Sequence, residues 1–373
     1  MDKHLHIVTH EIPWPIDHGG LVDLYYKITA LHKLGVKIHL HCFSDHIKPQ
    51  PELNKYCESV QYYKRKSGVA GLSLHLPYIV YSRRSNALSA NLKKDDYPVL
   101  LDGIHCTWML YKGELAGKKV FVRLHNTEYK YYHHLAKLER NFFKKTYFTN
   151  ESRRLKNYEQ AIADKAVFLA VSRQDATLYK KQFHAQDVHF FPVFIPYDTV
   201  ATHTGRGSYC LYQGNLAINE NEMAAEWLLT KVFKGMDIPF VIAGRNPSPA
   251  LLALIHHHGN ACIVSNPSVS EMQDLIARAQ LNLLPSFNDT GVKLKLLNAL
   301  YNGRHCIVNN AAVEGAVINN LCHVANTPED FRSAISRLFE TEIRQAEVQE
   351  RQSELQGVYD NEKNALHLMT LIW

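Results

Sequence analysis

The chain has 373 residues, 46% of them hydrophobic and 21% charged, a composition that excludes a disordered protein and allows two globular domains. Charge is uneven, because residues 1–200 hold 29 basic and 19 acidic side chains (net +10), whereas residues 201–373 hold 13 and 17 (net −4). No run approaches 18 apolar residues, and the first residues lack the apolar region and cleavage site of a signal peptide, so neither a transmembrane helix nor a secretory signal is expected.

The seven cysteines indicate the redox state of the protein's compartment. They are odd in number and contain no C-x-x-C pair, which disfavours a disulfide scaffold or a cysteine zinc site. We therefore expect buried free thiols in a reducing compartment, and a cytoplasmic protein.

In the first half, short apolar runs alternate with amphipathic stretches, the pattern of a parallel sheet covered by helices. In chain order, the pattern predicts a strand over 4–9, a helix over 21–34, strands over 37–43, 98–102 and 119–124, a helix over 129–147 and a strand over 166–171. Residues 188–199 contain two prolines and precede a small, polar stretch, so we place the interdomain connection there.

The alternation restarts in the second half. In chain order, it predicts a strand over 209–213, a helix over 219–231, strands over 240–243 and 281–284, a helix over 292–301, a strand over 305–309 and helical structure over 328–356. Gly303 is a typical residue to end the helix before it. The apolar terminus, 360–373, should pack on another part of the chain. The two halves look like two copies of one α/β architecture.

Two glycine-containing segments are candidate phosphate sites. Gly19-Gly20 lies between a strand and a helix, where glycine lets backbone N–H groups approach a phosphate, although a tight turn explains the pair equally well. The segment 288–295 follows an apolar run and opens a helix that Asn288, Asp289 or Thr290 could cap. Lys295 lies on an otherwise apolar helix face, where an ammonium needs an anion, unless it snorkels to solvent.

Two further candidates stand at strand ends, where doubly wound sheets bind ligands. Gly244-Arg245 follows an apolar strand, and an arginine there would suit a phosphate or a surface ion pair. His125 follows another strand and could exchange protons near neutral pH, although most histidines are structural. Asp102-Gly103-Ile104-His105 forms a similar cluster.

Several signals are missing. The sequence has no Asp-x-Asp pair to hold a divalent ion against a diphosphate, no P-loop lysine motif and no G-x-S-x-G. Three consecutive histidines, His256–His258, cannot share one helix face, so we interpret them as a solvated helix end and expect no metal site.

A basic, aromatic helix is predicted over 129–147. Its cations surround an apolar stripe and are Lys130, Lys137, Arg140, Lys144 and Lys145. Such a helix could lie on an anionic bilayer or contact an anionic acceptor, and the alternative is a core-packed helix with a solvated basic face.

The second half resembles the donor domain of retaining group-1 (family-4-type) glycosyltransferases, which have the GT-B fold. The matching motifs appear in the family's order and comprise Tyr212–Asn215, Ile242–Pro247, Leu283–Pro285, Gly291–Leu300, Gly303 and Ala312–Gly315. The first half agrees more loosely, at Pro13–Pro15, Gly19-Gly20 and His125-Asn126.

The resemblance implies two Rossmann-like, doubly wound α/β domains that face each other across a cleft. Residues 1–200 would form the acceptor-side domain, onto which the helix 357–373 packs back, and 201–356 the nucleotide-sugar donor domain. His125 and Lys295 would be catalytic. The donor would contact Gly19, Gly20, Gly214, Asn215, Arg245, Thr290, Gly291, Lys293, Lys295 and Asn298.

By the same resemblance, the protein would transfer a hexose, with retention and without a metal or other cofactor, from a UDP- or GDP-sugar to a glycan or lipid-linked acceptor. Such a protein would be cytoplasmic and could bind the inner face of the cell membrane. Thr290 and Asn298 stand where relatives often carry two glutamates, so an inactive sugar-nucleotide binder remains an alternative, as does a GT-B-fold epimerase. Nucleic-acid binding is disfavoured, because the basic residues are dispersed and no recognised module is present.

Overall fold

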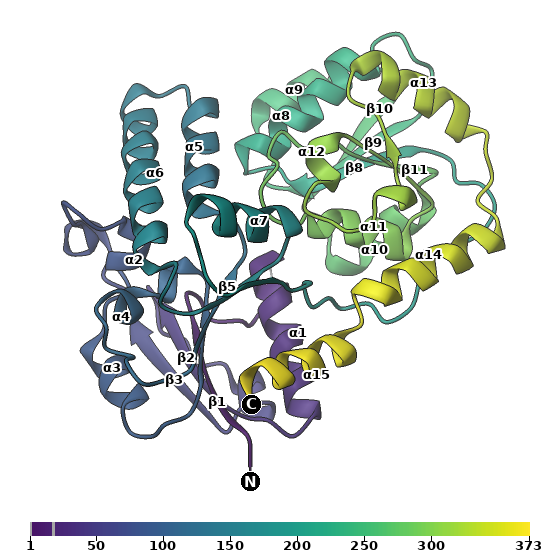
Figure 1. Ribbon diagram of the computed structural model, residues 1–373. Coiled ribbons are helices and arrows are strands. Elements are labelled where there is room, and N and C mark those ends of the chain that lie inside the picture. The colour runs from purple at the N-terminus through teal and green to yellow at the C-terminus, as the bar shows by residue number, and fades with distance from the viewer. Residues whose placement is uncertain (1, 17–18) are drawn as a thin grey trace. The chain divides into compact units, whose positions relative to one another are not determined.

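The structure is a computed structural model that describes residues 2–16 and 19–373 (Figure 1). The chain divides into two compact units. Unit 1 comprises Met1–Pro196 and Tyr359–Trp373, and unit 2 comprises Tyr197–Val358. The sequence placed these divisions at residues 200 and 356.

Unit 1 contains a parallel seven-stranded sheet in the order β3-β2-β1-β4-β5-β6-β7. Its strands are β1 (His4–Thr9), β2 (Lys37–Ser44), β3 (Ser59–Lys64), β4 (Val99–Asp102), β5 (Val120–Leu124), β6 (Val167–Ala170) and β7 (Val188–Phe190). Its helices are α1 (Gly19–Lys33), α2 (Tyr78–Tyr81), α3 (Asn86–Leu92), α4 (Trp108–Tyr111), α5 (Glu128–Leu138), α6 (Phe142–Ile162), α7 (Arg173–Gln182) and α15 (Asn361–Ile372).

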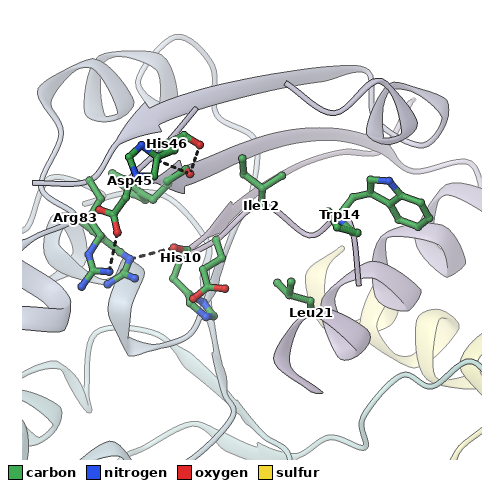
Figure 2. Close-up of a pocket in the computed structure, with 12 residues that line it drawn as sticks. His10, Ile12, Trp14, Leu21, Asp45, His46 and Arg83 are labelled. Atoms are coloured by element: carbon green, nitrogen blue, oxygen red, sulfur yellow. Dashed lines mark hydrogen bonds and ion pairs between the residues drawn. The ribbon is translucent and has the colours of Figure 1, made fainter. Parts of the chain in front are cut away.

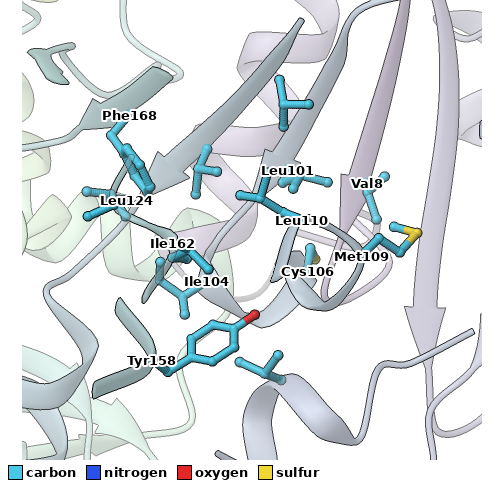
Figure 3. Close-up of a cluster of buried hydrophobic side chains, with 14 of the residues drawn as sticks. Val8, Leu101, Ile104, Cys106, Met109, Leu110, Leu124, Tyr158, Ile162 and Phe168 are labelled. Atoms are coloured by element: carbon cyan, nitrogen blue, oxygen red, sulfur yellow. The ribbon is translucent and has the colours of Figure 1, made fainter. Parts of the chain in front are cut away.

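Alternate residues of the central strands enter two separate cores, one on each face of this sheet. Leu100 and Phe121 pack in the core that contains α1 and α15, which lie side by side in Figure 1. Their neighbours Leu101 and Val122 pack in the opposite core, together with α6 and α7. Figure 3 shows part of this second core, where Tyr158 of α6 lies among aliphatic side chains. The apolar C-terminal helix is therefore an integral layer of unit 1.

Unit 2 contains a parallel six-stranded sheet in the order β10-β9-β8-β11-β12-β13. Its strands are β8 (Cys210–Asn215), β9 (Phe240–Arg245), β10 (Ala261–Ser265), β11 (Leu281–Leu284), β12 (His305–Val308) and β13 (His323–Val324). Its helices are α8 (Asn219–Trp227), α9 (Pro249–His256), α10 (Val269–Arg278), α11 (Leu294–Asn302), α12 (Asn310–Val313), α13 (Pro328–Phe339) and α14 (Gln345–Val358). Both units are thus Rossmann-like.

Several details differ from the sequence predictions, which also lacked the strands β3, β7, β10 and β13. The helix predicted over 129–147 is two helices, because α5 ends at Leu138 and Asn141 caps α6 by accepting a hydrogen bond from the Lys144 amide at 3.1 Å. The helix predicted from residue 292 begins at Leu294. All seven cysteines are free, but Cys262 is exposed and Cys322 is only partly buried.

Candidate functional site

The donor residues predicted in unit 2 surround the point where the strand order reverses. The sheet order places β8 beside β11, with later strands continuing outward on either side. Ligands of such sheets bind beyond the carboxyl ends of the strands at this switch point. Gly214 and Asn215 end β8, Arg245 ends β9, and Gly291 follows β11. The fold therefore brings these predicted residues to one edge of one sheet.

Glycines allow an unusually close approach between β8 and β9. Gly214 pairs with Gly244 and Asn215 pairs with Arg245. A Cβ atom on Gly244 would lie 2.0 Å from the carbonyl oxygen of Gly214, so no larger residue fits there without displacing a strand. Asn215 and Arg245 are both exposed at the end of this pair, where a ligand can reach them.

The loop after β11 is ordered by its own polar side chains. Asn288 Oδ1 accepts hydrogen bonds from the backbone N–H and the hydroxyl of Thr290, at 2.8 and 2.9 Å. Gly291 follows with φ of +64°, a left-handed conformation that favours glycine. The prediction that Asn288, Asp289 or Thr290 caps the helix is wrong, because the N-cap of α11 is Lys293. Thr290 is buried and holds the loop instead.

Lys293 and Lys295 place two ammonium groups at the first turn of α11. Lys293 Nζ donates to the carbonyl oxygen of Thr290 at 2.6 Å. Lys295 Nζ lies 3.2 Å from Asn221 Oδ1 and 5.1 Å from the centre of the Tyr212 ring. Burial lowers the pKa of Lys295 to about 8, although the nearby charge of Glu220 raises it. This ammonium is therefore poorly solvated and would gain from an anionic ligand.

Asn298 lies one turn further along α11, and its side chain is already engaged. Its Oδ1 accepts a hydrogen bond from Asn302 Nδ2 at 2.8 Å. In unit 1, Gly19 and Gly20 are the first two residues of α1 rather than a turn before it. Residues 17–18, which precede them, lie outside the described part of the chain.

His125 belongs to a buried network of charged side chains. Its Nε2 lies 3.0 Å from Asp102 Oδ2, and its Nδ1 lies 4.0 Å from Asp23 Oδ2. Lys27 Nζ bridges the same two aspartates at 3.0 and 3.1 Å. Arg123 donates two hydrogen bonds to Asp23, at 2.9 and 3.0 Å. Both ring nitrogens of His125 therefore face carboxylates, although its side chain keeps 16% of its exposure.

The electrostatics of this network favour ion pairs over a metal site. Asp23, Asp102 and His125 could offer three ligand atoms within 4.8 Å of one another. Burial alone would raise the pKa of Asp102, but Lys27 and His125 outweigh it and hold that pKa well below its usual range. Two cations already neutralise the two carboxylates, so an added metal ion would have to displace Lys27.

A cavity of about 300 Å³ opens in unit 1 at the carboxyl ends of β1 and β2 (Figure 2). His10, Asp45 and Arg83 lie on its polar side, whereas Ile12 and Trp14 lie on its apolar side. Sequence reasoning did not find this site, since its residues come from distant segments. Asp23 and Lys27 were also missed, although charges four residues apart on the apolar face of a helix were a usable signal.

The predicted basic residues are distributed over α5, α6 and their connection. Lys130 and Lys137 lie on α5, Lys144 and Lys145 on α6, and Arg140 between the helices. The two helices run side by side (Figure 1). At the start of α6, Phe142 and Phe143 keep 74% and 81% of their exposure. No helix in residues 2–16 and 19–373 is long and apolar enough to span a membrane.

The architecture defines the fold class, because solved glycosyltransferases of the GT-B fold align with nearly the whole chain. TarM of S. aureus aligns with a TM-score of 0.69 at 10% identity, covering 99% of this chain and 98% of its own. A Rickettsia africae glycosyltransferase aligns with a TM-score of 0.67 at 12% identity, covering 100% and 98%. WaaG, a glycosyltransferase involved in lipopolysaccharide biosynthesis, aligns at 0.64 and 13%, covering 99% of each chain. The protein thus has the predicted GT-B fold.

Sequence comparison relates part of the chain to one family. Residues 207–341 match the family described as glycosyl transferases group 1. The chain is also 28% identical over 337 residues to an uncharacterized 44.6 kDa protein in the cps region of Klebsiella pneumoniae, covering 84% of each.

Proposed function

We propose that the protein is a metal-independent, retaining hexosyltransferase that uses a UDP- or GDP-sugar and a glycan or lipid-linked acceptor. Its place would be the cytoplasm, at the inner face of the cell membrane. The observation that carries the proposal is Lys295. A poorly solvated ammonium, hydrogen-bonded to the neutral Asn221 amide at the switch point, is a site prepared for an anion.

The chemistry would need a stabilised leaving group. When the bond between the sugar and the diphosphate breaks, negative charge develops on the phosphate oxygens. Lys293, Lys295 and Arg245 together with the N-terminus of α11 would offset that charge in place of a metal ion. The acceptor would attack the face from which the diphosphate leaves, and a phosphate oxygen would help to remove its proton, so the anomeric configuration would be retained.

Relatives support the type of substrate. A TarM structure contains UDP and α-GlcNAc-glycerol, WaaG is involved in lipopolysaccharide biosynthesis, and the Klebsiella relative is named for a cps region. We infer by analogy a nucleotide donor and a role in cell-surface polysaccharide synthesis for this chain.

The donor site is tested by thermal shift and calorimetry with UDP, GDP and their sugars. We expect one nucleotide family to bind, and Lys295→Ala to weaken it at least tenfold. Lys234→Ala is the matched control, because Lys234 is an exposed lysine of the same unit. Equal affinity in the Lys295 variant would refute its role, and no stabilisation by any nucleotide would refute the donor site.

Turnover separates an enzyme from an inactive binder. A transferase should hydrolyse its bound donor slowly without an acceptor, whereas a binder would leave it intact and an epimerase would convert its sugar. We expect His125→Ala to slow this hydrolysis and the transfer while leaving nucleotide affinity unchanged. An unchanged rate would remove His125 from the catalytic residues and leave it a structural member of the Asp23–Asp102 network.

For the basic helices we propose contact with an anionic bilayer. The surface combines Phe142 and Phe143 with the five cations named above, each of which contributes about 1 kcal/mol near an anionic membrane. In a flotation assay, the protein should bind vesicles that contain phosphatidylglycerol, at low salt only, and should not bind neutral phosphatidylcholine vesicles. The double variant Phe142→Ser/Lys144→Gln should lose binding, with Lys234→Gln as control. Binding that ignores both salt and lipid charge would contradict the proposal.

A further inference from the structure

The cavity of unit 1 has two chemically different walls. At about 300 Å³, it lies at the lower end of the roughly 300–1,000 Å³ range of small-molecule sites. Ile12, Trp14 and Leu21 lie on one side, and Asp45, His46 and Arg83 lie on the other (Figure 2). A ligand that fills it therefore needs one apolar face and one polar or charged edge.

Arg83 is the unusual member of the polar wall. Its side chain is 5% exposed, and its guanidinium donates to two backbone carbonyls, of His10 at 3.2 Å and of Ile79 at 2.7 Å. Within residues 2–16 and 19–373 it forms no ion pair. Burial and the neighbouring charge of Arg65 lower the pKa of Arg83 to about 10. A buried guanidinium beside a second cation calls for an anion.

Neither of the carboxylates near this wall pairs with the Arg83 guanidinium. Arg65 lies 3.5 Å from Asp45, so this aspartate is already paired. Glu11 is exposed at the rim, where water weakens its field. Both carboxylates favour the charged form of Arg83 only from a distance. The guanidiniums of Arg65 and Arg83 remain the cations that an incoming carboxylate or phosphate would meet.

The opposite wall fits a sugar ring. Trp14 packs on Tyr25 with ring centres 5.3 Å apart, which fixes the indole, and its side chain remains partly exposed toward solvent. His10 lies between the walls, and its Nδ1 donates to the Asp102 carbonyl oxygen at 3.2 Å. Its Nε2 then lacks a proton and can accept a hydrogen bond from a sugar hydroxyl.

We propose that this cavity binds an acidic sugar of the acceptor, with its carboxylate or phosphate held by Arg83 and Arg65 and its ring against Trp14. The inference rests on the proposed transferase function, since it assigns a substrate class to the acceptor. It makes the acceptor a uronic acid or a sugar phosphate.

Binding of small-molecule probes to the full chain tests the inference without a known acceptor. Glucuronate, glucose 6-phosphate, glucose and inorganic phosphate are compared by saturation-transfer NMR and titration. We expect at least one of the two acidic sugars to bind at least tenfold more tightly than both glucose and phosphate. Preference for glucuronate would identify a uronic acid, and preference for glucose 6-phosphate a sugar phosphate. Phosphate binding equal to that of both acidic sugars, or no preference over glucose, would overturn the proposal.

Variants then locate the binding. Arg65→Gln changes a partly exposed guanidinium, so the variant should fold and lose at least tenfold in affinity for the acidic sugar. Arg84→Gln is the matched control, because Arg84 stacks on Tyr81 at 3.6 Å and does not line the cavity. Arg83→Lys keeps the buried charge but not the bidentate geometry, and should weaken binding with an unchanged circular-dichroism spectrum. Full affinity in both variants would refute the site.

The nucleotide titration on the same samples separates the two proposals. Acidic-sugar binding without any nucleotide binding would leave the cavity assigned and would refute the transferase function. Nucleotide binding without acidic-sugar binding would refute the cavity assignment and leave the transferase function standing.

Discussion

Both units build a parallel sheet around a switch point between the first and fourth strand of the unit, yet they treat charge there in opposite ways. In unit 1, Asp102 ends β4 and is tied to Lys27 and His125. In unit 2, the cations near the corresponding edge are Lys295 in α11 and Arg245 at the end of β9, and neither has a carboxylate within ion-pair distance among residues 2–16 and 19–373. One switch point is closed by its own ion pairs and the other is open to a ligand.

The difference shows that the same fold can either fix its charged side chains in ion pairs or leave cations available to a ligand. The ion-pair network of unit 1 fixes the positions of its own side chains, because each charge is held by two or three partners. An open set of cations keeps its electrostatic attraction for a ligand that arrives later. The half of the sequence that contains unit 2 carries a net negative charge. The positions of its few cations, rather than their number, would therefore determine where a diphosphate binds.

The largest effect is expected from breaking the closed network. Asp23→Asn removes the carboxylate that Arg123 and Lys27 share, leaving both cations buried. We expect a loss of about 3–5 kcal/mol in the free energy of unfolding of unit 1, measured by urea denaturation. Glu58→Gln is the control, because it breaks an exposed pair with Lys37 at 3.5 Å and should change stability by less than about 1 kcal/mol. Equal effects would show that the network contributes little stability.

The strands of both switch points could be predicted from sequence, whereas the closed network could not. Buried parallel strands such as β4 and β11 are short, mostly apolar runs, and their alternation with helices indicates the topology. The edge strand β3 was missed because its residues, Ser59–Lys64, are only partly buried and polar. Edge strands carry a weaker hydrophobic pattern, so composition alone does not mark them.

The two candidate sites also differ in how far the sequence predicts them. Residues such as Gly214, Arg245 and Lys295 belong to local motifs, in which a glycine or a cation directly follows a strand or opens a helix. The cavity of unit 1 has no such motif, since Arg83 reaches the end of β1 from the segment after α2. Its assembly depends on contacts between residues more than 70 positions apart, which no local pattern reports.

A second prediction tests whether the open switch point depends on backbone approach. Gly244→Ala would place a Cβ 2.0 Å from the Gly214 carbonyl oxygen and push β8 from β9. We expect a loss of about 1–3 kcal/mol in stability and a clear loss of nucleotide affinity, measured by thermal shift and calorimetry. Gly259→Ala, where no atom lies within 4 Å of the added Cβ, should behave like the wild type. A Gly244 variant with normal affinity would exclude this strand pair from the donor site.

A third prediction sharpens the comparison through pH. Glu159 in unit 1 is buried and accepts hydrogen bonds from the amides of Glu128 and Tyr129, at 2.9 and 3.1 Å. Burial and the charge of Glu128 raise its pKa from 4.5 to about 8. Between these values the folded protein holds a proton that the unfolded chain has lost. The free energy of unfolding should therefore fall as pH rises from 5 to 8.

Glu159→Gln removes this titrating group and keeps one of the two oxygens that accept these backbone hydrogen bonds. The variant should lose less stability than the wild type between pH 5.5 and pH 8, measured by urea denaturation at both values. Glu350→Gln, an exposed carboxylate of unit 2, should retain the full pH dependence. The histidines of unit 1 with lowered pKa values also change stability with pH, mainly below pH 6.5. Their contribution is the same in variant and wild type, so it cancels when the two pH dependences are subtracted. An identical pH dependence in wild type and Glu159→Gln would show that this carboxyl is charged in the folded state, with its charge stabilised by the N-terminus of α5.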